Sequence, residues 1–151
     1  MKIYAASSWR NNYQQGVVAE LRLWGHEVYD FKNPPARAGF GWEEIHTDWQ
    51  KWTTDEYLMA LEHPLAEAGF RSDFDAMEWA DACVLILPCG RSAHLELGWF
   101  AGKGKPTAIY SPEPMEPELM VKMCDLVTGD LHQVRDWLSM VEVELPIYPQ
   151  Y

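Results

Sequence analysis

Short apolar runs alternate with longer amphipathic stretches along the chain, which indicates strands alternating with helices. The run Ala82–Pro88 is apolar throughout, as is typical of a central parallel strand that is covered on both faces. The other segments of strand length are Lys2–Ala6, Glu27–Phe31, Thr107–Tyr110 and Leu126–Thr128. This alternation predicts an α/β protein with a mostly parallel, five-stranded sheet, right-handed crossovers and helices on both faces.

Apolar residues spaced three or four positions apart predict the helices that cover such a sheet. In Asn11–Trp24 they form one face, and Gly25 follows as a stop signal. The other expected helices are Thr54–Glu62, Ser72–Trp79, Ser92–Gly102 and Leu131–Val141. The stretch Lys32–Thr53 is rich in proline, glycine and tryptophan and is predicted to be a long loop. No repeat or linker divides the chain, so residues 1–151 are expected to form a single domain.

Composition narrows the class of protein. The net charge of −11 opposes binding along a nucleic-acid backbone, because that needs a cationic surface. The cysteines Cys83, Cys89 and Cys124 are an odd number without close pairing, which argues against a disulfide framework. The N-terminus lacks the apolar stretch of a signal peptide, and no run has the length of a membrane span. We therefore expect a cytoplasmic protein that binds neither a nucleic-acid polymer nor a membrane.

Ligands of parallel α/β sheets bind at the carboxyl ends of the strands. That rule selects Ala6–Asn12, Phe31–Asn33 and Pro88–Glu96. In the last of these, Ser92 is the expected N-cap, so Glu96 lies one residue beyond the capping-box position and has no local capping role. A carboxylate there is exposed, paired or functional, and an ordinary exposed helix glutamate remains the alternative.

Other candidates are weaker on their own. Asp73 lies at the start of the helix expected over Ser72–Trp79, where an acid also complements the helix dipole. Ser8 and Arg10 precede a helix N-terminus and suit an anion or sugar hydroxyls, although serine-rich loops also simply cap helices. His94 could touch a ligand. Tryptophans in loop-like sequence could line a pocket for a flat ligand: Trp9, Trp42, Trp49 and Trp52.

Signals for metals and nucleotide cofactors are missing from the sequence. The five histidines lack the close spacing of metal ligands, and no Cys-x-x-Cys occurs. No Gly-x-Gly-x-x-Gly follows the first strand and no Gly-Lys-Ser/Thr loop is present. We expect no metal and no cofactor.

Several of these segments together resemble the nucleoside 2-deoxyribosyltransferase family, including its branch of 2′-deoxynucleoside 5′-phosphate N-hydrolases. The resembling stretches are Ile3–Arg10, Asp73–Asp81, Ser92–Gly98 and Gly104–Pro106, in the family's order and over roughly half of the chain. The resemblance implies a flavodoxin-like (Rossmann-like) three-layer sandwich. It also implies a small-molecule nucleoside or nucleotide substrate and a homodimer or higher homo-oligomer.

The resemblance gives each matching residue a role. Glu96 would be the nucleophile, Asp73 the acid/base residue and Tyr4 the tyrosine that orients the glutamate. Ser8 and Arg10 sit where the nucleotide hydrolases hold a 5′-phosphate. The full set of expected substrate-binding residues is Ser8, Trp9, Arg10, Gly90, Arg91, Ser92 and His94.

The implied reaction is cleavage or transfer at the N-glycosidic bond of a (deoxy)nucleoside or nucleoside 5′-monophosphate. A carboxylate attacks the anomeric carbon while an acid protonates the departing base, and water or a second base then resolves the glycosyl-enzyme intermediate. The sequence does not decide between hydrolase and transferase. Ser8 and Arg10 favour a phosphorylated substrate over a nucleoside.

Some positions depart from the family pattern. The transferases commonly have an acidic residue about six positions before the glutamate, where this chain has Gly90 followed by Arg91. An arginine there favours a more anionic or more carbonyl-rich ligand. The tryptophan-rich stretch Gly39–Trp52 has no counterpart. The tail Tyr148–Tyr151 could reach a neighbouring subunit's site, but a free surface tail is the favoured interpretation.

Two other classes of function remain open. One is a nucleotide- or sugar-nucleotide-binding module that has the pocket without turnover. The other is an unrelated flavodoxin-like signalling or interaction domain.

Overall fold

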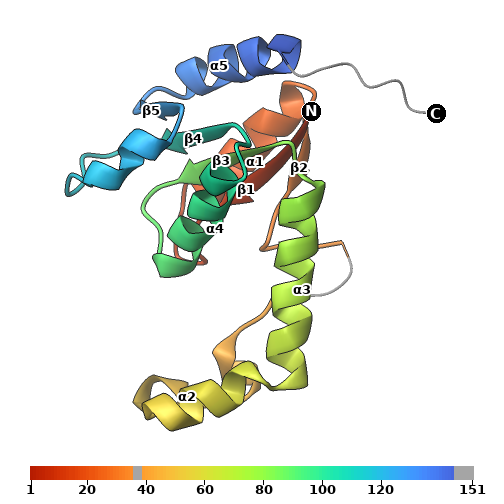
Figure 1. Cartoon of the computed structure of the whole chain (residues 1–151), viewed down its shortest axis with the longest axis vertical. Coiled ribbons are helices and arrows are strands. Elements are labelled where there is room, and N and C mark those ends of the chain that lie inside the picture. The colour runs from red at the N-terminus through yellow and green to blue at the C-terminus, as the bar shows by residue number, and fades with distance from the viewer. Residues whose placement is uncertain (36–38, 145–151) are drawn as a thin grey trace. The chain divides into compact units, whose positions relative to one another are not determined.

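The computed structural model describes residues 1–35 and 39–144, so the tail Tyr148–Tyr151 lies outside the described residues. The chain forms two compact units. Residues 1–30 and the chain from Ala80 onward form the first, and Phe31–Trp79 form the second. Along the sequence, the second unit is therefore inserted between two strands of the first (Figure 1). None of the helices in residues 1–35 and 39–144 has the length and apolar character that a membrane crossing requires.

The first unit is built on a five-stranded sheet whose paired strands all run parallel. The strands lie in the order β2-β1-β3-β4-β5. They are β1 (Lys2–Ala6), β2 (Glu27–Tyr29), β3 (Ala82–Ile86), β4 (Thr107–Tyr110) and β5 (Leu126–Thr128). This order, with helices on both faces, is the flavodoxin-like arrangement. It confirms the predicted fold class, although β2 and β3 each end earlier than the sequence suggested.

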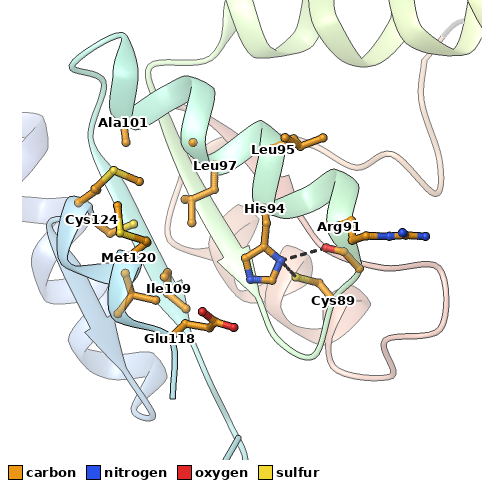
Figure 2. Close-up of a pocket in the computed structure, with 14 residues that line it drawn as sticks. Cys89, Arg91, His94, Leu95, Leu97, Ala101, Ile109, Glu118, Met120 and Cys124 are labelled. Atoms are coloured by element: carbon orange, nitrogen blue, oxygen red, sulfur yellow. Dashed lines mark hydrogen bonds between the residues drawn. The ribbon is translucent and has the colours of Figure 1, made fainter. Parts of the chain in front are cut away.

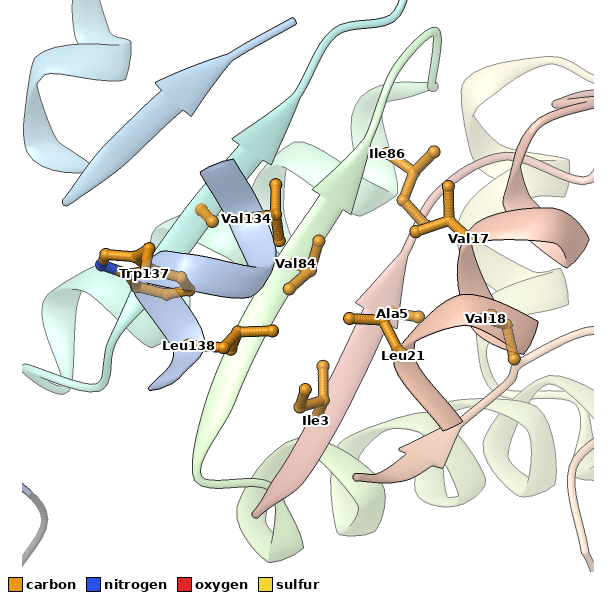
Figure 3. Close-up of a cluster of buried hydrophobic side chains, with 11 residues drawn as sticks. Ile3, Ala5, Val17, Val18, Leu21, Val84, Ile86, Val134, Trp137 and Leu138 are labelled. Carbon is orange, nitrogen blue, oxygen red and sulfur yellow. The ribbon is translucent and has the colours of Figure 1, made fainter. Parts of the chain in front are cut away.

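One face of the sheet carries the main apolar core. Because side chains alternate along a strand, Ile3 and Ala5 of β1 share a face with Val84 and Ile86 of β3. Helices α1 (Gln14–Leu23) and α5 (Leu131–Glu144) cover this face (Figure 3). The other buried members of the cluster are Val17, Val18, Leu21, Ala108, Val134, Trp137 and Leu138. All four of the named strand residues are completely buried, as expected for a sheet covered by helices.

Helix α4 (Arg91–Gly102) covers the opposite face. Its buried residues Ala93, Leu97 and Phe100 recur every three or four positions. The ring of Phe100 lies 5.7 Å from the ring of Tyr4, which in turn stacks on Tyr29 at 5.4 Å. These contacts fix α4 over β1.

Two helix starts differ from the sequence-based expectation. The N-cap of α4 is Gly90, without a side-chain capping bond, so the assignment of Ser92 as the N-cap was wrong. Helix α1 begins at Gln14 and not at Asn11. The reason is local, because the side chain of Asn11 accepts hydrogen bonds from the backbone N–H groups of Tyr13 and Gln14.

The second unit contains two α-helices, α2 (Thr54–Leu61) and α3 (Pro64–Trp79), after two short 3₁₀ helices. Thr53 caps α2 in a capping box with Glu56, as the sequence predicted. Helix α3 is twice as long as expected, because Pro64 is suited to a first helical position and the helix continues through Gly69. Asp73 therefore lies well inside α3, and the explanation of this acid by the helix dipole was wrong.

The stretch expected to be a long loop carries an aromatic cluster. Its 3₁₀ helices are η1 (Trp42–Glu44) and η2 (Trp49–Lys51). The ring of Trp42 packs edge-on against Phe40, Trp52 and Tyr57, at centroid distances of 4.9, 5.8 and 5.8 Å. Such edge-to-face pairs are stabilising. Trp42 and Trp52 thus contribute to the packing of the second unit.

Candidate active site

The carboxyl ends of β1 and β3 are neighbours in the sheet, and they bring two of the three segments selected from the sequence together. Ala6–Asn12 follows β1, and Pro88–Glu96 leads from β3 into α4. After β1 the chain goes to one side of the sheet, and after β3 it continues on the other, which makes this the topological switch point where α/β proteins bind ligands. The third segment, Phe31–Asn33, belongs to the second unit.

Glu96 lies in the second turn of α4, at the border of its buried face. It is three residues after buried Ala93 and four before buried Phe100, so all three share one side of the helix. Its side chain is half-buried. Tyr4 is almost fully buried beneath α4 and contacts Phe100, one helical turn from Glu96. The glutamate is thus neither a capping residue nor a freely exposed one.

The charge of Glu96 acts on two thiols, that of Cys83 near the start of β3 and that of Cys89 after its end. Burial, and then the negative charge of Glu96, raise the pKa of Cys89 to about 12. The same two causes, in the same order, raise the pKa of buried Cys83 well above its ordinary value. Both thiols are therefore neutral near pH 7, and the expectation that Cys83 is a small buried hydrophobe is consistent with its environment. A neutral Cys89 is a poor nucleophile.

The loop after β1 presents Ser8, Trp9 and Arg10. The backbone N–H of Arg10 donates to the hydroxyl of Ser8 at 3.3 Å, and the N–H of Asn11 donates to the carbonyl of Ser8 at 3.0 Å. Both bonds tighten the loop into a turn. Trp9 and Arg10 are exposed, and Ser8 is half-buried. These side chains are accessible to a ligand at the strand ends.

Two residues outside the expected set of site residues join the ends of β1 and β3. The hydroxyl of Ser7 donates to the carbonyl of Ile86 at 2.7 Å. The amide of Asn11 donates to the carbonyls of Ile86 and Pro88, at 3.1 and 2.9 Å. The one local signal for Asn11 was its residue type, because asparagine before a helix commonly bonds the first free N–H groups.

A cavity of about 690 Å³ opens beside α4 in the first unit (Figure 2). One side is formed by α4 and the other by the segment that contains the 3₁₀ helix η3 (Leu119–Met123). Its wall is mostly apolar and includes Leu97, Ile109, Met120 and Met123. A volume of this size suits a small organic ligand.

Three of the expected substrate-binding residues line this cavity: Gly90, Arg91 and His94. The Nδ1 atom of His94 lies 3.0 Å from the carbonyl oxygen of Gly90 and 3.5 Å from the Cys89 sulfur. The Arg91 side chain extends away from the apolar wall (Figure 2). Glu96, Ser8, Trp9, Arg10 and Ser92 are not part of the lining.

Asp73 lies in the second unit, where its side chain is half-buried in α3. Its expected role with Glu96 stays a prediction. Among residues 1–35 and 39–144, no three His, Cys, Asp or Glu side chains are placed to hold a metal ion.

Comparison with known proteins identifies the fold. No family model matches the chain, and a search with its sequence matches no curated protein. Solved structures do match. Over the full length of both chains, the structure is similar to a 2-deoxyribosyltransferase from Bacillus psychrosaccharolyticus, with a TM-score of 0.63 and 24% sequence identity.

Two further structures are similar to this one. A conserved protein from Enterococcus faecalis V583 has a TM-score of 0.61 and 15% identity, over 93% of this chain and 98% of that chain. The CMP N-glycosidase BcmB of Clostridium botulinum has a TM-score of 0.49 and 13% identity, over 92% of this chain and 99% of that chain. The chain therefore has the nucleoside deoxyribosyltransferase-like fold, and the family resemblance is confirmed at the level of the fold.

Proposed function

We propose that this protein is an enzyme that cleaves or transfers the N-glycosidic bond of a (deoxy)nucleoside or nucleoside 5′-monophosphate. The observation that carries the proposal is the place of Glu96. It is a half-buried carboxylate on α4, one turn from the contact of Phe100 with Tyr4, beside the switch point of β1 and β3. The fold shared with a 2-deoxyribosyltransferase supports the same chemistry.

In the proposed mechanism, Glu96 attacks the anomeric carbon of the sugar. A bond forms between a carboxylate oxygen and this carbon while the bond from the carbon to the base nitrogen breaks. Asp73 donates the proton that the departing base needs, which leaves Asp73 as a base. It then takes a proton from water, or from the nitrogen of a second base, as that acceptor attacks the glycosyl-enzyme intermediate and releases Glu96. Tyr4 orients the carboxylate of Glu96.

The loop after β1 is proposed to hold the 5′ end of the substrate. Ser8 offers a hydroxyl and Arg10 a guanidinium, which suits the oxygens of a phosphate. Trp9, 52% exposed, offers a ring face for stacking. Gly90, Arg91, Ser92 and His94 surround the start of α4 and are proposed to contact the base. The arginine in this set favours a carbonyl-rich base.

The direct test is release of free base from a panel of nucleosides, deoxynucleosides and their 5′-monophosphates. We expect release from at least one class, faster for monophosphates because of Ser8 and Arg10. Glu96→Gln, which removes the nucleophile with little change of shape, should lower the rate by roughly 10³-fold or more. The matched control is Glu20→Gln on the exposed side of α1, which should leave the rate unchanged.

Each outcome has a distinct meaning. Measurable binding without release from any substrate would support the non-catalytic binding module instead. Full activity of Glu96→Gln would remove this residue from the mechanism. A second free base in the reaction separates the two enzyme types, because only a transferase forms a new nucleoside.

A further inference from the structure

The side chain of Asn11 connects the two segments that carry the proposed site. It is 4% exposed, and it bonds four backbone groups. Its amide nitrogen donates to the carbonyls of Ile86 and Pro88, at 3.1 and 2.9 Å. Its oxygen accepts from the N–H groups of Tyr13 and Gln14, at 2.7 and 2.9 Å. Two donor hydrogens and two lone pairs are what a carboxamide offers, so these partners match its capacity.

The four bonds divide into two functions. The two bonds from Tyr13 and Gln14 hold the start of α1 and could be replaced by any capping acceptor. The two bonds to Ile86 and Pro88 cross to another strand. They fix the point at which the chain leaves β3. Pro88 lies two residues before Gly90 and eight residues before Glu96. The hydroxyl of Ser7 adds a third bond across the same gap.

We propose that Asn11 is a positioning residue for the reaction, a role that rests on the proposed function. It holds the loop Ser8–Arg10, which takes the 5′ end of the substrate, at a fixed distance from the segment that leads into α4 and Glu96. A glycosyl transfer step needs the carboxylate oxygen aligned with the anomeric carbon. A displacement of about 1 Å in such an arrangement lowers a rate by about 10²-fold.

Asn11→Asp separates this role from simple helix capping. Aspartate keeps an oxygen for the N–H groups of Tyr13 and Gln14, so the cap survives. It replaces the donating amide by a carboxylate oxygen that faces two carbonyl oxygens, so the connection to β3 is lost. Asn12→Asp is the matched control, because it makes the same chemical change at the exposed neighbouring position. Ser7→Ala removes one cross-strand bond by a smaller change.

The experiment measures kcat and KM for base release from a nucleoside 5′-monophosphate, with the folded fraction of each variant determined by circular dichroism. We expect Asn11→Asp to lower kcat about 10²-fold with KM within about threefold of the unaltered protein. Ser7→Ala should lower kcat several-fold, and Asn12→Asp should change neither constant. A purely structural role would instead lower activity only in proportion to the folded fraction.

Two results would overturn the inference in distinguishable ways. If the unaltered protein releases base and folded Asn11→Asp and Ser7→Ala both keep kcat within about twofold, the positioning role is wrong and the proposed function stands. If the unaltered protein releases no base from any nucleoside or monophosphate, the proposed function fails and the positioning role fails with it. Should Asn11→Asp not fold, Ser7→Ala decides alone by the same criterion.

Discussion

Cys89 lies beside a histidine, as catalytic cysteines do, but its thiol is in the unreactive neutral form. Its sulfur lies 3.5 Å from the Nδ1 atom of His94, in a cavity beside α4. Burial and the nearby charge of Glu96 nevertheless raise its pKa to about 12. A raised thiol pKa favours the neutral form, so only about one molecule in 10⁴ would carry a thiolate at pH 8. The histidine therefore does not make this cysteine a nucleophile.

Alkylation by iodoacetamide tests this state. We expect all three cysteines of the folded protein to react much more slowly at pH 8 than free glutathione, because burial raises the pKa of Cys83 and Cys124 as well. The reaction should accelerate only at strongly alkaline pH. Mass spectrometry of labelled peptides gives the rate at each site, and urea-unfolded protein is the control in which every thiol should react. Rapid labelling of Cys89 in the folded protein would contradict its assignment as a neutral, unreactive thiol.

The residues of the candidate site differ in how far the sequence could reveal them. Ser8, Arg10 and Glu96 lie in segments that follow strands, and Tyr4 lies within β1, so their approximate place followed from the strand pattern. The bonds that Ser7 and Asn11 make to β3 could not be predicted, because their partners are distant in the sequence. Their bonds to Ile86 span 79 and 75 positions, respectively, and no local pattern records a hydrogen bond across such a distance.

Two helical glycines illustrate how packing decides the effect of a single methyl group. A Cβ atom at Gly69 of α3 would lie 2.8 Å from the Cβ of Phe40, an atom that cannot move aside cheaply. A Cβ atom at Gly98 of α4 would meet nothing within 4 Å. An added methyl group at Gly98 therefore has open space within the chain. Each position favours alanine by about 1 kcal/mol of helix propensity.

The expected effects on stability have opposite signs. Gly69→Ala should lower the free energy of unfolding by up to about 2 kcal/mol, because overpacking costs about 1–3 kcal/mol and the gain in propensity is about 1 kcal/mol. Gly98→Ala should raise it by roughly 0.5–1 kcal/mol. Urea unfolding followed by circular dichroism measures both. If both variants changed the free energy of unfolding by the same amount in the same direction, Phe40 would move aside at little cost.

The elements themselves were predictable to different degrees. All five strands were found because each is a segment of strand length between helical or turn-rich segments, and the most apolar of them, β3, is buried at every position. Helix α3 was only half found, because its first half contains Pro64 and Gly69, which are residue types that commonly mark turns. Its buried Gly69 packs against Phe40, which lies outside the helix. The aromatic cluster around Trp42 was likewise hidden, because composition alone cannot distinguish a packed loop from an open one.

At the scale of the whole molecule, a group of exposed apolar side chains surrounds the cavity beside α4. Leu95, Leu119, Met120 and Met123 are 77, 76, 61 and 55% exposed. Apolar side chains gathered in this way are typical of an interface. The homo-oligomer implied by the family resemblance would cover them, and we expect the protein to form at least a dimer through this surface.

Light scattering after size exclusion tests the assembly. The expected mass is about twice the 17.4 kDa of one chain, or a higher multiple. A double variant, Leu95→Glu with Met120→Glu, should shift the protein to the monomer. Leu23→Glu on α1 is the control, because Leu23 is 78% exposed but lies far along the sequence from the cavity segments. A monomeric mass for the unaltered protein would contradict the expectation.

The insertion of Phe31–Trp79 between β2 and β3 also sets the order in which the sheet can form during translation. The backbone N–H of Lys2 donates to the carboxylate of Asp81, 79 positions later. Strand β1 therefore cannot pair with β3 until the whole second unit has been synthesised. Until then the first unit consists of β1, α1 and β2, and a two-stranded sheet of this kind is at best marginally stable. Ile3, Ala5 and Leu21 therefore lack the cover that β3 and α5 later supply while the ribosome synthesises the insertion. The time needed to synthesise the insertion is therefore a period in which the nascent chain exposes apolar surface that is prone to aggregation.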